Sequence, residues 1–223
     1  MTQHKWTRRA MMSGITGVGV GALQLTAPQL AAAQAPEAAF RPPRHQQDAW
    51  INNLPGSHRT IIDSVSPRGV GEALLFARNL YLANASGYGL KDSDLAVIVC
   101  LRHASTGFAF NDAMWAKYGA QLAGGPDFTD PKTKQTPTTN LHNAADGPGI
   151  TINAVTARGM QFAVCTMATQ RLSGQIATAK GLVADAVFKE LTSNLVPNSH
   201  MVVAGVVAVT RAQEYGYTFL NAG

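Results

Sequence analysis

The chain has 223 residues and a formal net charge of +5 at pH 7. The first 33 residues hold three basic and no acidic residues, so the remainder has a charge of about +2, which is too small to predict binding to nucleic acid or to an anionic membrane surface. The roughly 190 residues that remain are enough for one domain with its own core, and the sequence has no internal repeat or heptad pattern.

The N-terminus has the three parts of a signal peptide. Arg8 and Arg9 lie in a basic start, a modestly apolar, glycine-rich run covers 14–30, and small residues follow it. The arginine pair predicts export by the twin-arginine route. Glutamine and proline interrupt the apolar run, so a cleaved signal is favoured over a membrane anchor. We therefore predict a signal peptide over 1–33, a periplasmic location and no stable membrane span after cleavage. Cleavage after Ala33 is favoured over cleavage after Ala35, which would leave Pro36 just past the cut.

Residues 34–57 carry four prolines and scattered polar groups. This composition predicts an extended N-terminal arm with at most a short helical turn near Trp50, whose ring is a candidate anchor for the arm.

Residues 58–223 alternate between strand and helix patterns. Short β-branched or continuous apolar runs predict strands, and apolar residues at helical spacing, stopped by glycine or proline, predict helices. The predicted strands are 60–65, 95–101, 161–165, 200–204 and 217–220, and the predicted helices are 70–85, 112–122, 150–158, 168–177, 184–195 and 206–215. Residues 123–148 form a predicted long loop, of the kind that is usually functional or mobile. The alternation predicts a single α/β domain with a mostly parallel five-stranded sheet between helix layers, which binds ligands at the carboxyl edge of the strands.

Cys165 is the first candidate for chemistry. It ends the predicted strand 161–165, and residues 166–171 are typical of a helix start. A thiol at this place lies near the positive end of the helix dipole and near free backbone N–H groups, which favour the reactive thiolate. The alternative is a buried cysteine that acts as a small apolar residue.

A soft-metal site is a second interpretation of the same edge. Cys100 and His103 follow one predicted strand at C-x-x-H spacing, and Cys165 and Met167 follow another. Thiolate, imidazole and thioether together suit copper(I) or zinc. The two cysteines could equally form a disulfide or stay free, and the alternative for His103 is a hydrogen bond to loop backbone.

Arg102 is a candidate ligand-binding residue together with His103. Its guanidinium would bind an anion such as thiosulfate or sulfite, or pair with Asp112. His200 begins a predicted strand, where a core or capping role is favoured over catalysis.

The C-terminal half resembles the DsrE/DsrF-like sulfur-relay family. The resemblance is carried by GMQFAVC at 159–165, VPNSHMVVAGVVAV at 196–209 and RAQEYGY at 211–217, and it extends over about 58–223. It implies a flavodoxin-like three-layer domain, usually assembled as a homo- or hetero-oligomer, and a persulfide carried on the cysteine that matches Cys165. The signal peptide indicates an exported subgroup, whose partners would be periplasmic proteins of sulfur metabolism.

These observations lead to one leading hypothesis and two rivals. The leading one is a periplasmic DsrE/DsrF-like protein that handles sulfur through Cys165, as a persulfide carrier or as a thiol partner of another sulfur protein. The first rival is a non-catalytic protein that binds a soft metal or a small ligand at the same edge. The second is a scaffold subunit with inert cysteines.

Overall fold

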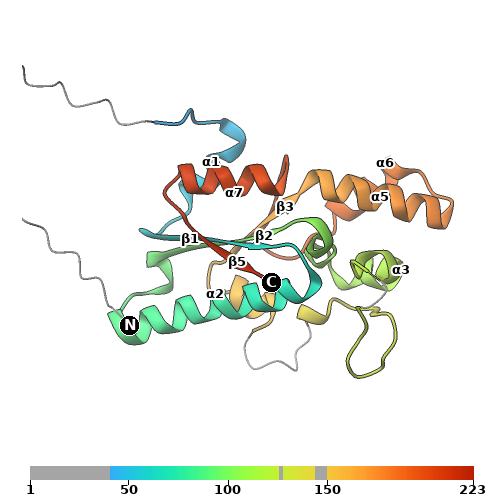
Figure 1. The fold of residues 1–223 in the computed structure, drawn as a ribbon, viewed down its shortest axis with the longest axis horizontal. Helices are drawn as coiled ribbons and strands as arrows, with labels where there is room; N and C mark the ends of the chain where they lie inside the picture. The colour runs from blue at the N-terminus through green and yellow to red at the C-terminus, as the bar shows by residue number, and fades with distance from the viewer. Residues whose placement is uncertain (1–40, 126–127, 144–149) are drawn as a thin grey trace, which may run out of the picture. The chain divides into compact units, whose positions relative to one another are not determined.

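The computed structural model describes residues 41–125, 128–143 and 150–223 (Figure 1). The predicted signal peptide, 1–33, and the first residues of the predicted arm lie outside the described residues. The segment Pro42–Gly223 forms one compact unit. Within the described part of the chain, no helix combines the length and the apolar character needed to cross a membrane.

Five strands, all parallel, form one sheet in the order β4-β3-β2-β1-β5. The predicted five-stranded α/β domain is therefore confirmed, with three layers as in a flavodoxin-like domain, although the strand order differs from the 2-1-3-4-5 order of flavodoxin itself. All seven residues of β2 are buried, as the continuous apolar run at 95–101 predicts for a strand covered on both faces. The strands are β1 (His58–Ser64), β2 (Leu95–Leu101), β3 (Gln161–Cys165), β4 (Ser199–Val202) and β5 (Thr218–Ala222).

Helices cover both faces of the sheet. In Figure 1, α1 and α7 lie on one face and α2 on the other, while α3, α5 and α6 extend beyond the sheet at the right. The α-helices are α1 (Ala49–Asn53), α2 (Pro67–Tyr88), α3 (Asp112–Leu122), α4 (Ile152–Thr156), α5 (Thr166–Lys180), α6 (Ala184–Thr192) and α7 (Gly205–Glu214). Short 3-10 helices are η1 (Gln46–Asp48), η2 (Asp92–Asp94), η3 (His103–Ala109) and η4 (Leu141–Asn143).

Helix starts follow local capping chemistry. The Ser66 side chain accepts a hydrogen bond from the backbone N–H of Gly69 at the start of α2, where Pro67 occupies the first helical position. The Asn111 side chain accepts one from the backbone N–H of Met114 at 3.3 Å at the start of α3. The first cap lies just beyond the carboxyl end of β1, whereas the second follows η3, which separates α3 from β2.

The described part of the arm packs on the α7 side of the sheet. The short helical turn predicted near Trp50 is present, and the Trp50 ring stacks on His200 with centroids 4.1 Å apart. Ile51 is fully buried, and its carbonyl accepts a hydrogen bond of 2.7 Å from the Tyr217 hydroxyl. His200 thus packs between the arm and the sheet, and its Nε2 lies 3.0 Å from the Gln161 side-chain oxygen. Burial lowers the pKa of His200.

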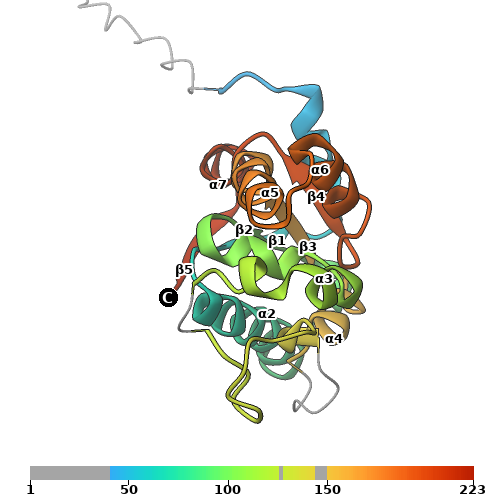
Figure 2. The same ribbon diagram turned by 90° about the vertical axis from the view of Figure 1, so that its right-hand side faces the viewer.

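Figure 2 views the molecule from the end where α3, α5 and α6 lie. Since all strands are parallel, the chain leaves β1, β2, β3 and β4 at this same end. The turns into η3, α5 and α7 therefore meet here, and they carry the predicted site residues.

Candidate functional site

Cys165 is the last residue of β3 and the N-cap of α5. Its Sγ accepts a hydrogen bond from the backbone N–H of Ala168 at 3.4 Å, and its carbonyl accepts one from the Thr169 hydroxyl at 2.9 Å. The residue is 7% exposed and lines a cavity of about 300 Å³. The sequence prediction that this thiol lies at a helix N-terminus is confirmed, and the helix dipole there favours a negative charge on sulfur.

The cavity above Cys165, here called the thiol cavity, is formed by the starts of α5 and α7 and by the turn after β2. Within the part of the chain that the structure describes, no carboxylate lines it, whereas two arginines and a histidine do, so its surroundings favour an anion. Its lining residues are Arg102, His103, Cys165, Met167, Ala168, Arg171, Ala204, Gly205 and Val206.

Arg102 is held in place by a buried carboxylate. Its Nε and Nη2 donate to the two oxygens of Asp63 at 2.8 and 2.7 Å, and Asp63 is 3% exposed. The hydrogen bonds to Asp63 raise the pKa of Arg102. The alternative pairing of Arg102 with Asp112 is wrong, because Asp112 instead accepts a hydrogen bond from the backbone N–H of Asn140 at 2.8 Å. Arg102 keeps about a quarter of its side chain exposed while it lines the cavity.

His103 occupies a conformation that L-residues seldom adopt. Its φ is +58°, and its side chain is exposed at the start of η3. The turn is tied down by the buried Ser105, whose Oγ accepts from the backbone N–H of Arg102 at 2.9 Å and donates to the carbonyl of Ser64 at 2.7 Å. Neighbouring residues thus hold the strained backbone of His103 in place. Residues with such strained backbones cluster at functional sites. No hydrogen bond of His103 to loop backbone is present among the described residues.

Cys100 lies beneath the thiol cavity and does not line it. It is fully buried, and its Sγ donates a weak hydrogen bond to the carbonyl of Gly205 at 3.6 Å. Burial, and to a smaller extent the nearby Asp63 carboxylate, raises the pKa of the Cys100 thiol well above its usual value. The structure therefore separates the two cysteines into one at the cavity and one in the core.

The two thiols are both free. Cys100 pairs in register with Ala163, which is two residues before Cys165 on the neighbouring strand. Given a strand spacing near 4.8 Å and a rise near 3.3 Å per residue, this offset puts the two Cα atoms about 8 Å apart. A disulfide rarely spans more than about 7 Å between Cα atoms, so this backbone does not permit one without a shift of the strands.

The predicted soft ligands are only partly brought together. His103, Cys165 and Met167 line the thiol cavity, with Met167 at its rim and 64% exposed, whereas Cys100 is covered by Gly205. Within residues 41–125, 128–143 and 150–223, no group of three or more His, Cys, Asp and Glu side chains could hold a metal ion. A metal site here would therefore depend on the Met167 thioether.

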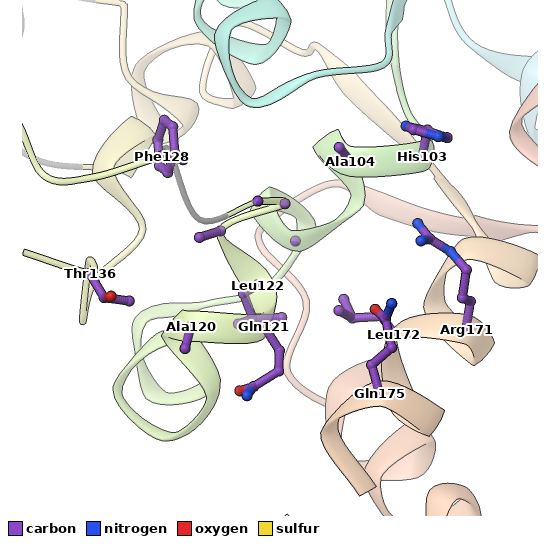
Figure 3. Close-up of a pocket in the computed structure, with 14 residues that line it drawn as sticks. His103, Ala104, Ala120, Gln121, Leu122, Phe128, Thr136, Arg171, Leu172 and Gln175 are labelled. Atoms are coloured by element: carbon purple, nitrogen blue, oxygen red, sulfur yellow. The ribbon is translucent and has the colours of Figure 1, made fainter. Parts of the chain in front are cut away.

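Arg171 is a site residue that the sequence reasoning missed. It lines the thiol cavity and also a second cavity of about 620 Å³, here called the groove cavity, which shares His103 with the first (Figure 3). Among the described residues Arg171 makes no hydrogen bond or ion pair, so its charge is available to a ligand. The signal that could have identified it is helical spacing: Ala168, Arg171 and Gln175 recur along one face of α5 from the thiol onward.

Comparison with protein-family models gives no match, and comparison with curated proteins gives none either.

Proposed function

We propose that this chain is an exported DsrE/DsrF-like protein that carries sulfur as a persulfide on Cys165. The observation that supports this best is the place of the thiol: Cys165 caps α5 and lines a cavity with Arg102, His103 and Arg171, and none of the described carboxylates lines that cavity. The resemblance of 159–217 to the sulfur-relay family supports the same assignment.

The proposed step is a transfer of one zero-valent sulfur atom. The Cys165 thiolate attacks the outer sulfur of a donor persulfide, a new S–S bond forms at Cys165, and the S–S bond of the donor breaks as its thiolate leaves. The outer sulfur keeps its oxidation state, so the step needs no oxidant or reductant. A second thiolate, on an acceptor, would remove the sulfur by the reverse reaction.

The surroundings favour both the attacking thiolate and the product. A persulfide on Cys165 is an anion whose charge lies one atom farther out, in the cavity rather than at the helix cap. The starts of α5 and α7 and the guanidinium of Arg171 surround that position. Asp63 neutralises Arg102 in part but fixes its guanidinium, so Arg102 supplies hydrogen-bond donors at a defined place.

The test is sulfur loading from a persulfide donor, measured by intact mass and by sulfane sulfur content. Cys165→Ser should abolish loading, while Cys100→Ser, the matched control, should retain it because Cys100 is covered by α7. Loading that survives in Cys165→Ser, or that is lost equally in both folded variants, would contradict the proposal.

A soft-metal binding protein is the second candidate, since His103, Cys165 and Met167 line one cavity. Copper(I) or zinc content separates the two candidates. His103→Ala should weaken metal binding by about tenfold or more if the imidazole is a ligand, but should change sulfur loading only modestly. A wild type that takes up neither sulfur nor metal would favour a scaffold subunit.

The export proposal rests on the arginine pair. Changing Arg8 and Arg9 to Lys should leave the precursor uncleaved and in the cytoplasm, because the twin-arginine receptor reads both guanidinium groups. Cell fractionation and immunoblotting measure this, and normal processing of the variant would contradict it.

Homo-oligomer formation and a periplasmic sulfur-metabolism partner belong to the same proposal. Light scattering of the purified protein tests the oligomer.

A further inference from the structure

The groove cavity continues the thiol cavity along α5. Both cavities are lined by His103 from η3 and by Arg171 from α5, and the groove cavity also has Leu172 and Gln175 of α5 in its wall. In Figure 3 the Arg171 side chain extends from α5 toward the His103 side of the pocket, and Gln175 lies one turn farther along the helix. The two cavities therefore adjoin each other at His103 and Arg171, and a ligand in the groove cavity would lie beside the entrance to the thiol cavity.

The chemistry of the groove cavity favours a polar anion with an apolar portion. Arg171 supplies a charge that no described residue pairs with, and Gln175 and Thr136 supply an amide and a hydroxyl. Phe128 and Leu122 supply apolar surface on the same cavity, and no acidic side chain among the described residues lines it. Its volume of about 620 Å³ lies in the range of sites for small organic molecules.

The distance along α5 between the Cys165 thiol and the groove cavity indicates the size of the ligand. Arg171 follows Cys165 by six residues and Gln175 by ten, so at a rise of about 1.5 Å per residue they lie roughly 9 and 15 Å along the helix from the thiol. Thiosulfate or sulfite is too short to contact the thiol and Gln175 together. A peptide of about three residues, roughly 10–11 Å long when extended, spans the distance from the thiol to Arg171. Side chains on helices lean toward the helix N-terminus, so the amide of Gln175 reaches back toward the end of such a peptide.

We infer that the groove cavity binds the body of a small peptide-like thiol that bears a carboxylate, and presents the sulfur of this molecule to Cys165. Arg171, at the junction of the two cavities, pairs with the carboxylate, and Gln175 hydrogen-bonds to an amide of the ligand. This inference rests on the proposed function, for which it names the class of sulfur donor or acceptor.

The probe is S-methylglutathione, a tripeptide with carboxylates and amides whose sulfur is blocked, so that binding is measured without sulfur transfer. Titration calorimetry should detect binding to the wild type and to Cys165→Ser. Arg171→Gln should weaken binding by about tenfold or more, since it removes a charge-assisted hydrogen bond, and Gln175→Ala by about threefold.

Arg78→Gln is the matched control, because it removes the same charge from α2, on a residue that lines neither cavity. It should bind the probe as the wild type does. No binding to the folded wild type, or equal weakening in Arg78→Gln and Arg171→Gln, would overturn the inference.

The two proposals fail in different ways. Sulfur loading that depends on Cys165 while the probe does not bind would refute the groove site alone. Binding of the probe that depends on Arg171, together with unchanged loading in Cys165→Ser, would refute the persulfide carrier and leave the binding site.

Discussion

At the level of single residues, the two cysteines occupy opposite environments. Cys165 lines a cavity at the start of α5, where its Sγ already accepts a backbone hydrogen bond. Cys100 is fully buried in the layer between the sheet and α7, and burial raises its pKa. Only one of the two thiols is therefore placed to react with a molecule from solution.

We expect iodoacetamide at neutral pH to modify Cys165 at least about tenfold faster than Cys100, because the thiolate is the reacting species and Cys100 both holds its proton and lies out of reach. Timed alkylation followed by peptide mapping measures the two rates. Unfolding in urea should bring the rates together, which serves as the control. Faster labelling of Cys100 in the folded protein would remove Cys165 from its proposed role.

Part of the site was predictable because the end of an apolar run in the sequence marks the end of a strand. The apolar runs at 95–101 and 161–165 stop at Leu101 and Cys165, so the residues after them were expected at one edge, and the structure has Arg102, His103 and Met167 there. The partner of Arg102 was not predictable, since Asp63 lies inside a β-branched strand far away in the sequence and only the register of β1 with β2 brings it close.

At the level of elements, the start of α7 lies unusually close to β2. A Cβ atom added to Gly205 would lie 2.6 Å from Cβ of Arg102 and 3.1 Å from Sγ of Cys100. The absence of a side chain at this one position lets the helix start reach the thiol cavity.

Gly205→Ala should therefore destabilise the fold by about 1–3 kcal/mol, because α7 or Arg102 must move. Gly174→Ala is the control: Gly174 lies in α5 with no atom within 4 Å of the added Cβ, so alanine there should be neutral or stabilise by up to about 1 kcal/mol. Urea unfolding of both variants measures the difference. Equal free energies of unfolding for the two variants would mean that α7 or Arg102 can move away from the added Cβ without destabilising the fold.

The elements themselves were predictable to different degrees. Long apolar or periodic segments were found at the right places, with ends that differ by a few residues, such as α2, which extends to Pro67–Tyr88 rather than 70–85. The 3-10 helix η3 was missed, because HASTGFA at 103–109 has neither helical nor strand periodicity. Its shape depends on tertiary contacts instead, including Gly107, where an added Cβ would meet the carbonyl oxygen of Leu122 at 1.9 Å.

At the level of the whole molecule, two partly buried histidines, His142 and His200, make the free energy of unfolding depend on pH. The His142 ring packs at a tilted angle beside Phe108, with its Nε2 3.1 Å from the carbonyl oxygen of Pro67, and the His200 ring stacks on Trp50. Burial lowers the pKa of both histidines. Both are therefore neutral in the folded chain at pH values where the unfolded chain already takes up protons.

The free energy of unfolding should have its full value above about pH 6.5, the pKa of histidine in the unfolded chain. It should fall as the pH drops below this value, because the unfolded state then binds more protons than the folded state. Urea unfolding at about pH 7.5, 6.5 and 5.5 measures how the free energy of unfolding changes around that pKa. The double variant His142→Gln and His200→Gln, which keeps hydrogen-bonding groups but cannot titrate, should have a flatter profile. An unchanged profile would place the acid sensitivity in other groups.

The pairing of β5 with β1 joins the last strand of the sheet to the first. The hydroxyls of Thr60 and Thr218 lie 3.2 Å apart although 158 residues separate them in the chain. During synthesis at about 5–20 residues per second, β1 through β4 emerge while the outer edge of β1 has no neighbour. Until β5 has been made, that edge offers free backbone N–H and C=O groups to any other extended chain. The nascent protein is therefore most exposed to aggregation in the interval just before its last strand appears.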